Sequence, residues 1–206
     1  MIVLSLYNPV PLLAQSSQAS AWFQKGQAAF KTGNYSQAMQ WWKKAAERDD
    51  ANAEFSVGLL YCTGQGVTQD YQQAMQWWRK AAKKGMAKAE FSIGVLYGKG
   101  LGVAQDDQEA MKWYQKAAAQ GNADAQYNIG ILYINGQGVE LDPQKAMNWW
   151  LKAAALGHAE AEYNIGVLFV QGYGVAQNNE EARKWFMKAA ALGNADAKEA
   201  LEILNK

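Results

Sequence analysis

The sequence predicts an all-α fold, a right-handed α-solenoid of helix–turn–helix repeats, and three observations lead to this prediction. A unit of 36 residues recurs, with copies that open at Ala51, Ala87, Ala123 and Ala159. Glycines return at fixed places in every copy, and an aromatic pair stands shortly before Lys-Ala-Ala in its second half. Self-similarity at such a period is typical of proteins in which each unit needs its neighbours to bury its apolar face.

Residues 1–20 are expected to precede the repeats, as the remnant of a signal peptide or as a flexible leader. The stretch from Met1 to Leu6 is apolar, and Leu-Leu-Ala-Gln at residues 12–15 resembles a cleavage site. The basic segment that normally opens a secretory signal is missing, because the first cationic residue is Lys25. We favour a periplasmic or secreted protein, and a cytoplasmic protein is the alternative.

The solenoid is expected to occupy residues 21–206 as a single domain. Residues 21–50 form a shorter copy of the unit, because Lys-Thr-Gly-Asn-Tyr replaces the longer loop of the later copies. Four full copies follow, at residues 51–86, 87–122, 123–158 and 159–194. Residues 195–206 are expected to form a capping helix, in which Glu202 stands where the full copies have a glycine.

Each full copy is predicted to fold as an antiparallel pair of helices. The first helix shows apolar residues at helical spacing, as in residues 87–97. A Gly-x-Gly loop leads to an N-cap for the second helix, such as Asp106 or, with proline at the first helical position, Asp142. A glycine after Lys-Ala-Ala is expected to end that helix in the left-handed conformation.

Glycines inside the first helices predict a close contact with the second helices. They stand at Gly58, Gly94, Gly130 and Gly166. A glycine in a helix interior costs up to about 1 kcal/mol relative to alanine. We therefore expect the facing helix to approach closely at these points, because its bulky tryptophan needs the space.

Composition limits the classes of function. The net charge of +1 gives no basic footprint for nucleic acid, and no apolar run approaches the roughly 20 residues of a membrane-spanning helix. Cys62 and His158 are the only residues of their types, so we expect no metal site and no cofactor. Residues 121–182 hold two Lys or Arg against seven Asp or Glu, which we interpret as an ordinary solvated surface. We expect a monomer without stable membrane insertion.

Residues 51–194 resemble four Sel1-like repeats, which are relatives of tetratricopeptide repeats, and residues 21–50 resemble a tetratricopeptide unit. The resemblance implies a non-catalytic adaptor, of a kind frequent in bacteria, that holds a protein partner in its concave face. Members of the family occur in envelope and secretion-related complexes, and some are immunity proteins against secreted effectors. The resemblance therefore favours an envelope- or secretion-related scaffold, with an immunity protein among its forms.

The same resemblance implies which residues face inward: the second, fifth, sixth, ninth, twelfth and thirteenth of each repeat, called the inner positions below. Three of these positions combine apolar side chains with amides and hydroxyls, which suits an extended or helical partner segment. The candidate partner-binding groove consists of Phe55, Ser56, Leu59, Phe91, Ser92, Val95, Tyr127, Asn128, Ile131, Tyr163, Asn164 and Val167. Part of this stripe could instead belong to the core between repeats.

No catalytic residue is predicted. His158 lies in a turn without a Ser or Cys in a hydrolase context, and Glu54, Glu90 and Glu162 recur along the solenoid instead of converging as an acid–base pair. Eight of the nine tryptophans belong to the aromatic pairs, where one residue is expected to pack between helices and its neighbour to cover the edge. The alternatives to a scaffold are a hydrolase of cell-wall or β-lactam substrates and a carbohydrate-binding module.

Overall fold

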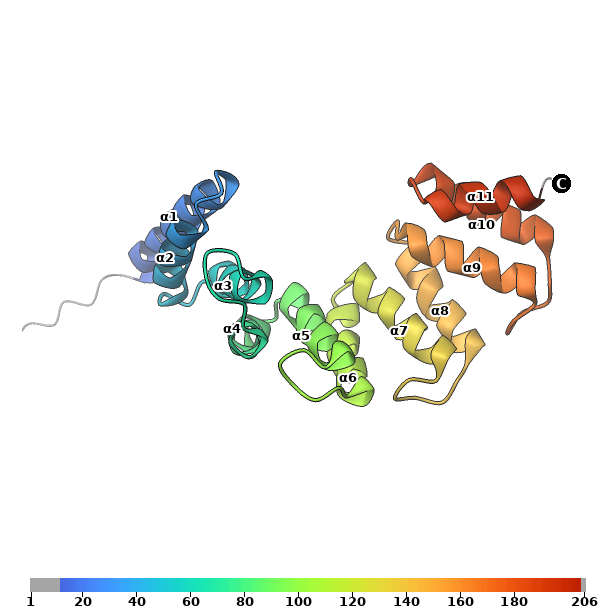
Figure 1. The fold of residues 1–206 in the computed structure, drawn as a ribbon, viewed down its shortest axis with the longest axis horizontal. Helices are drawn as coiled ribbons and strands as arrows, with labels where there is room; N and C mark the ends of the chain where they lie inside the picture. The colour runs from blue at the N-terminus through green and yellow to red at the C-terminus, as the bar shows by residue number, and fades with distance from the viewer. Residues whose placement is uncertain (1–11, 205–206) are drawn as a thin grey trace, which may run out of the picture. The chain divides into compact units, whose positions relative to one another are not determined.

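A computed structural model describes residues 12–204, and this part of the chain contains eleven α-helices and no strand (Figure 1). The helices are α1 (Leu12–Lys31), α2 (Tyr35–Ala46), α3 (Ala51–Thr63), α4 (Tyr71–Lys83), α5 (Ala87–Lys99), α6 (Asp107–Ala119), α7 (Ala123–Asn135), α8 (Pro143–Ala154), α9 (Ala159–Gln171), α10 (Asn179–Ala191) and α11 (Ala195–Leu204). The chain divides after Met86 into two compact units. The N-terminal unit holds α1–α4, and the C-terminal unit holds α5–α11.

Consecutive helices pack as pairs joined by short loops, which confirms the predicted all-α fold of helix–turn–helix repeats. The N-terminal unit contains the pairs α1/α2 and α3/α4. The C-terminal unit contains α5/α6, α7/α8 and α9/α10, and α11 packs on α10 (Figure 1). Within this unit α6 also contacts α7, and α8 contacts α9. Within the C-terminal unit each repeat therefore buries its apolar face on the next one. In residues 12–204 no helix has the length and apolar character needed to cross a bilayer.

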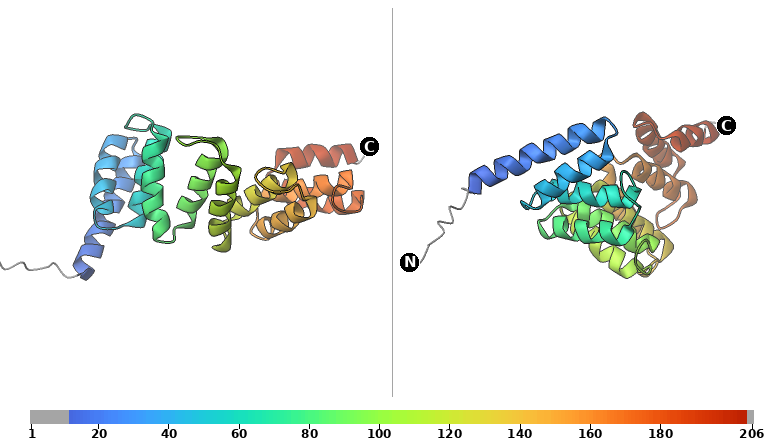
Figure 2. Two further views of the ribbon diagram at one scale, coloured as in Figure 1. Left: turned by 90° about the horizontal axis from the view of Figure 1, so that it is seen from below. Right: turned by 60° about the vertical axis from the view of Figure 1, so that its left-hand side comes forward.

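The first helix begins earlier than the sequence predicted. α1 starts at Leu12, whereas the solenoid was expected to start at residue 21. Residues 12–20 contain neither glycine nor proline, and their leucine, alanine and glutamine residues are favourable in a helix. Ala19 is buried, and α1 extends past the shorter α2 (Figure 2). Residues 1–11, the larger part of the predicted leader, lie outside the described residues.

The predicted capping residues begin the second helices. The carboxylate of Asp106 accepts the backbone N–H of Glu109 at 2.9 Å, and that of Asp142 accepts the N–H of Lys145 at 2.9 Å. Pro143 follows Asp142 as the first residue of α8. Glycines with positive φ follow the second helices of the four full copies, as predicted: Gly85, Gly121, Gly157 and Gly193.

The glycine inside each first helix makes room for an aromatic ring of the second helix, which confirms the predicted close approach. A Cβ atom on Gly130 would overlap the indole ring of Trp150. The short separation lets the Trp150 indole N–H donate to the carbonyl oxygen of Tyr127 at 3.1 Å. The same contact joins Gly26 to Trp42, Gly58 to Trp78, Gly94 to Tyr114 and Gly166 to Phe186.

The Gly-x-Gly loops that hold Gly138 and Gly174 pack against the start of the second helix of the preceding repeat. Gly138 has a φ of 67°, in the left-handed region that favours glycine. A Cβ atom there would lie 2.7 Å from the backbone of Asp107 and Gln108, at the start of α6. A Cβ atom on Gly174 would lie 2.6 Å from Pro143, at the start of α8. These glycines therefore have a structural role in the packing of one repeat on the next.

The core is a row of small clusters at the contacts between helix pairs. Between α8 and α9 it consists of Ala146, Trp150, Ala153, Ala161, Ile165 and Leu168. The third residue of each first helix is a fully buried alanine, at Ala53, Ala89, Ala125 and Ala161, and α11 has Ala197 at the same position. A side chain this small lets the neighbouring helix come close.

Candidate functional site

All twelve residues of the predicted groove lie on first helices and are half-buried. Phe55, Ser56 and Leu59 belong to α3 in the N-terminal unit, and the other nine belong to α5, α7 and α9 in the C-terminal unit. Their part in binding a partner stays a prediction. Their surroundings differ, however, and decide which of them can face a ligand.

The aromatic residues at the fifth position contribute to the packing of their own repeat. Tyr127 stacks on Trp150, with ring centroids 6.4 Å apart, and Phe55 stacks on Trp78 at 6.0 Å. Tyr127 also stacks on the ring of His158, at 4.6 Å and an interplanar angle of 16°. These rings therefore hold the helix pairs together, whatever else they contact.

The polar residues at the sixth position mostly bond to their own helix. The hydroxyl of Ser56 donates to the carbonyl oxygen of Asn52 at 2.8 Å, and the amide of Asn128 donates to that of Asp124 at 2.7 Å. Each Asn side chain keeps a second N–H and a carbonyl oxygen for other partners. The amide of Asn164 lies 3.5 Å from the hydroxyl of Tyr127, and so links α9 to α7.

The α7–α9 pocket opens on the inner positions of the C-terminal unit. Its volume is about 350 Å³. The lining residues are Ile131, Ile134, Asn135, Trp150, Asn164, Val167, Leu168, Gln171 and Tyr173. Six of these occupy inner positions, namely Ile131, Ile134, Asn135, Asn164, Val167 and Gln171. The side chains are four aliphatic, two aromatic and three amide groups, and the only ionisable one is a tyrosine.

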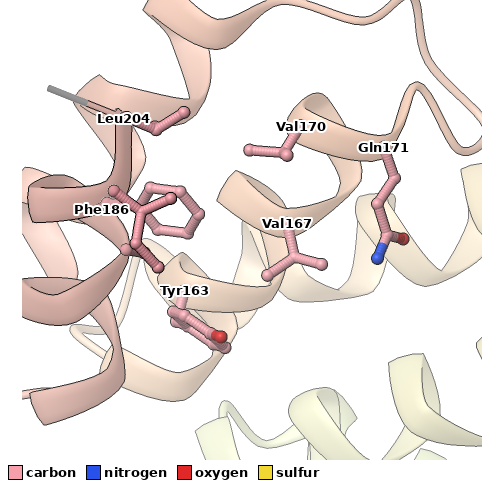
Figure 3. A pocket seen from close by; sticks show the side chains of 8 residues that line it. Tyr163, Val167, Val170, Gln171, Phe186 and Leu204 are labelled. Atoms are coloured by element: carbon pink, nitrogen blue, oxygen red, sulfur yellow. The ribbon is translucent and has the colours of Figure 1, made fainter. Parts of the chain in front are cut away.

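A second pocket, the α9–α11 pocket, lies between α9 and α11 and has a volume of about 200 Å³. It is lined by Tyr163, Val167, Val170, Gln171, Phe186, Ala200, Ile203 and Leu204. Val170 of α9 and Leu204 of α11 point toward one another across it, with the ring of Phe186 beside them (Figure 3). Ile203 is 62% exposed although it is aliphatic.

Val167 and Gln171 line both pockets, so the two pockets lie on the two sides of one face of α9. We call the combined hollow across α7, α9 and α11 the C-terminal groove. Of the residues in the predicted groove, Ile131, Tyr163, Asn164 and Val167 line it. The groove is also lined by the residues at the twelfth and thirteenth positions of α7 and α9, which were likewise expected to face inward: Ile134, Asn135, Val170 and Gln171.

His158 caps α9, a role that the sequence did not indicate. Its Nδ1 accepts the backbone N–H of Ala161 at 3.3 Å, and its side chain is 11% exposed. Its Nε2 lies 3.4 Å from a carboxylate oxygen of Asp124. Glu160 lies 3.3 Å from Nδ1. No serine or cysteine is among these contacts, so this cluster has no nucleophile for acyl transfer.

Buried polar side chains recur at the fourth position of the first helices, at Glu54, Glu90, Gln126 and Glu162. The sequence showed the recurrence but not the burial. Glu54 bonds to the ammonium of Lys84 at 2.8 Å. Despite the opposite effect of its own burial, hydrogen bonds to Glu54 and Asp49 raise the pKa of Lys84.

The two later glutamates lack such a cation. Glu90 accepts a hydrogen bond from Gln120 at 2.7 Å, and burial raises its pKa against the effects of Gln120 and Lys116. Glu162 has an oxygen, Oε2, without a hydrogen-bond partner. Burial raises its pKa too, and the charge of Lys188 opposes this only in part. These glutamates lie on separate helices. In residues 12–204 no group of three or more His, Cys, Asp or Glu is placed to hold a metal ion.

The aromatic pairs divide as predicted between the interior and the edge. The second residues are buried: Trp42, Trp78, Tyr114, Trp150 and Phe186. The first residues are half-buried, and each has a lysine three positions later over its ring, from 3.9 Å for Lys152 over Trp149 to 4.7 Å for Lys44 over Trp41. A sugar ring would have to displace these ammonium groups in order to stack there.

The family comparison agrees with the repeat boundaries. A family model described as the Sel1 repeat matches residues 51–86, 87–122, 123–158 and 159–194. A second model, described as a tetratricopeptide repeat, matches residues 19–52. No curated protein shows a significant match to the chain.

Solved structures share this fold. A Sel1 repeat protein from Oxalobacter formigenes is 34% identical with a TM-score of 0.80, and the match covers 87% of this chain and 75% of that one. A protective antigen of uropathogenic Escherichia coli, described as displaying an SLR fold, is 35% identical with a TM-score of 0.84; 94% of this chain matches 43% of that chain. An immunity protein from Pseudomonas aeruginosa is 23% identical with a TM-score of 0.56, over 96% of this chain and 73% of that one, and this likeness extends to the fold alone.

Proposed function

Because this chain belongs to the Sel1 repeat family, we propose that it is a non-catalytic scaffold that holds a segment of a partner protein in the C-terminal groove. Repeats of this kind build protein–protein interaction modules, since stacked helix pairs present an extended surface. The proposal locates binding on α7, α9 and α11, all in the C-terminal unit, whereas a part in binding for the groove residues of α3 and α5 stays a prediction.

One observation carries the proposal: two apolar pockets meet on a single face of α9. Val167 and Gln171 belong to both, so a bound segment can place side chains in both pockets while its backbone crosses α9. The amides of Asn135, Asn164 and Gln171 stand among the aliphatic residues. Apolar pockets for side chains together with amides for the backbone are the usual means of recognising a peptide segment.

The alternatives have less support. A hydrolase needs a nucleophile with a base beside it, and the contacts of His158 offer no such pair. A sugar-binding face needs open aromatic rings, whereas lysines cover the half-buried tryptophans. The likeness to the Pseudomonas immunity protein gives no reason to prefer a secreted effector over another protein partner.

We also propose that the protein acts in the bacterial envelope. The apolar stretch from Met1 to Leu6 and the 35% identity to a protein described as a protective antigen support this location. Cell fractionation of the C-terminally tagged full chain tests it. Recovery in the periplasmic or secreted fraction is expected, and recovery only with cytoplasmic markers would refute it.

Site-specific photo-crosslinking in the source cell tests the scaffold function. A benzophenone amino acid replaces Gln171, whose exposed side chain lines both pockets. The matched control places it at Gln144, an exposed residue of α8 that lines neither pocket. We expect a discrete protein adduct from position 171 and none of that size from position 144.

Two results would contradict the proposed function. One is the same adduct at equal yield from both positions, because the contact would then not be specific to the groove. The other is the absence of any adduct from position 171 together with an adduct from position 144. In that case the second helices, and not the groove, would form the binding surface.

A further inference from the structure

Two carboxylates lie near the starts of α7 and α9, two helical turns before the groove residues Ile131 and Val167. Asp124 and Glu160 are the second residues of their repeats, which is an inner position, and their side chains are 64% and 61% exposed. His158 lies between them, at 3.4 Å from Asp124 and 3.3 Å from Glu160. These two carboxylates outnumber the single imidazole, so the starts of α7 and α9 keep a net negative charge.

The repeat itself does not require these carboxylates. At the same position the two earlier repeats have Asn52 and Lys88. An acidic residue is favourable in the first turn of a helix because of the helix dipole, yet α5 has Lys88 in that turn. Among the first helices from α3 onward, an acid at this position occurs in α7, in α9 and, as Asp196, in α11, and a ligand of the C-terminal groove can depend on it.

The groove itself is apolar and carries no cation. The inner positions of α7 and α9 beyond the carboxylates hold only aromatic, aliphatic and amide side chains. At the thirteenth position Asn135 and Gln171 replace the Lys99 of α5. A cationic group on a ligand would therefore meet attraction at the starts of α7 and α9, and no like charge on the inner positions of these two helices.

The spacing along the helix gives the distance between the carboxylates and the α7–α9 pocket. From the second residue of a repeat to the ninth is seven residues, which corresponds to about 10 Å at the α-helical rise. Ile131 and Val167 at the ninth position line the α7–α9 pocket. A side chain in this pocket is thus about 10 Å from the carboxylates.

We propose that the C-terminal groove selects a partner segment with a bulky aliphatic or aromatic side chain and a Lys or Arg whose cationic group lies about 10 Å from it. This inference rests on the proposed function and specifies its ligand. The apolar side chain supplies most of the affinity, because buried anchors dominate binding. The cation chiefly supplies orientation and discrimination, because exposed ion pairs are weak and sensitive to salt.

Selection from a random-peptide phage library on the immobilised full chain tests the inference. The enriched peptides are expected to combine an apolar residue with Lys or Arg. One of them is then synthesised, and its affinity is measured by fluorescence anisotropy at low and at physiological salt. Added salt should weaken its binding, as it does for exposed charge pairs.

Variants separate the contribution of the carboxylates from that of the groove. Asp124→Asn with Glu160→Gln should weaken the peptide about fivefold, as expected for two exposed ion pairs. The control, Glu180→Gln with Glu202→Gln, removes the same charge at exposed residues that line neither pocket, and should leave the affinity unchanged. Val167→Gln places an amide where both pockets meet, and should abolish binding. If circular dichroism shows that this variant is unfolded, Gln171→Trp blocks the groove from an exposed position instead.

The outcomes distinguish this inference from the proposed function. Enriched peptides without Lys or Arg, or with an affinity that the carboxylate variant leaves unchanged, would overturn the inference; a loss of binding in the groove variant would then still support the scaffold. Peptides that bind the groove variant as tightly as the wild type would overturn both. A library that yields no enriched peptide would also count against both.

Discussion

Glu162 is a buried side chain that destabilises the fold when it is ionised. In the first full repeat the equivalent Glu54 is neutralised by Lys84 at 2.8 Å. The residue at the place of Lys84 in the last full repeat is Leu192, which has no donor to offer. Glu162 is only 7% exposed, and its Oε2 has no hydrogen-bond partner. Its ionised form is therefore poorly stabilised, which agrees with its raised pKa.

We predict that Glu162→Gln stabilises the protein by about 1 kcal/mol at neutral pH, because a neutral amide costs less to bury than a carboxylate. The new amide copies Gln126, which donates to the carbonyl oxygen of Ala118 at 3.4 Å. The same change at Glu54 should instead destabilise the protein by about 1 kcal/mol, because it removes the partner of Lys84. Urea denaturation of the two variants measures both effects, and equal signs would refute this account.

The gain from Glu162→Gln should depend on pH. The folded pKa of Glu162 is raised, so the folded state holds this proton more tightly than the unfolded state. The stabilising contribution is then complete below the ordinary value of 4.5 and is lost as the pH rises through the raised pKa. The variant should therefore gain on the wild type over that window. A difference in melting temperature that is constant from acid to neutral pH would contradict the assignment.

At the scale of helices, the glycines of α5 and α7 separate the effect of helix propensity from that of steric overlap with the facing helix, which a sequence alone cannot distinguish. Gly130→Ala is predicted to destabilise the protein by about 1–2 kcal/mol, because overlap with Trp150 outweighs the better helix propensity of alanine. Gly98→Ala should stabilise it by up to about 1 kcal/mol, since a Cβ there would lie 3.5 Å from the hydroxyl of Tyr114, an ordinary contact. Thermal melts test both, and destabilisation by the second change would show that propensity is not the deciding term.

Sequence patterns within one repeat predicted the structural features that form within one repeat. The cap at Asp142, the glycine stops and the pairing of Gly130 with Trp150 each depend on residues within one repeat. The fourth-position burial, the capping role of His158 and the stacking of Tyr127 on His158 depend on how consecutive helices meet. These three features have no distinct pattern in the sequence of a single repeat. The sequence did not predict the early start of α1, because residues 12–20 were expected to belong to the leader.

The same limit applies to the candidate groove. The sequence identified the helical face that bears Ile131, Asn164 and Val167, and these residues line the α7–α9 pocket. It could not show that Tyr127 has ring contacts with both Trp150 and His158. Replacing Tyr127 would therefore disturb packing as well as any ligand, and Val167 and Gln171 are better positions for testing the groove.

At the scale of the whole chain, stability should follow from contacts between neighbouring helices alone. α11 is the last of these contacts in the described residues. It covers the cluster of Ala182, Phe186 and Ala189 with Ala197, and the backbone of Leu204 accepts a hydrogen bond from Arg183 at 2.9 Å. Removal of α11 therefore exposes α9 and α10 directly and the earlier helices only through them.

We predict that a chain ending at Asn194 loses hydrogen-exchange protection in a graded manner. The loss should be greatest in α10, smaller in α8 and smallest in α6, because each repeat transmits the effect only through its contact with the next. A chain ending at Leu204 is the control and should keep full protection. Equal loss from α5 to α10 would instead show that the C-terminal unit unfolds as one cooperative block. In that case a ligand bound between α9 and α11 would stabilise α5 as strongly as it stabilises α10.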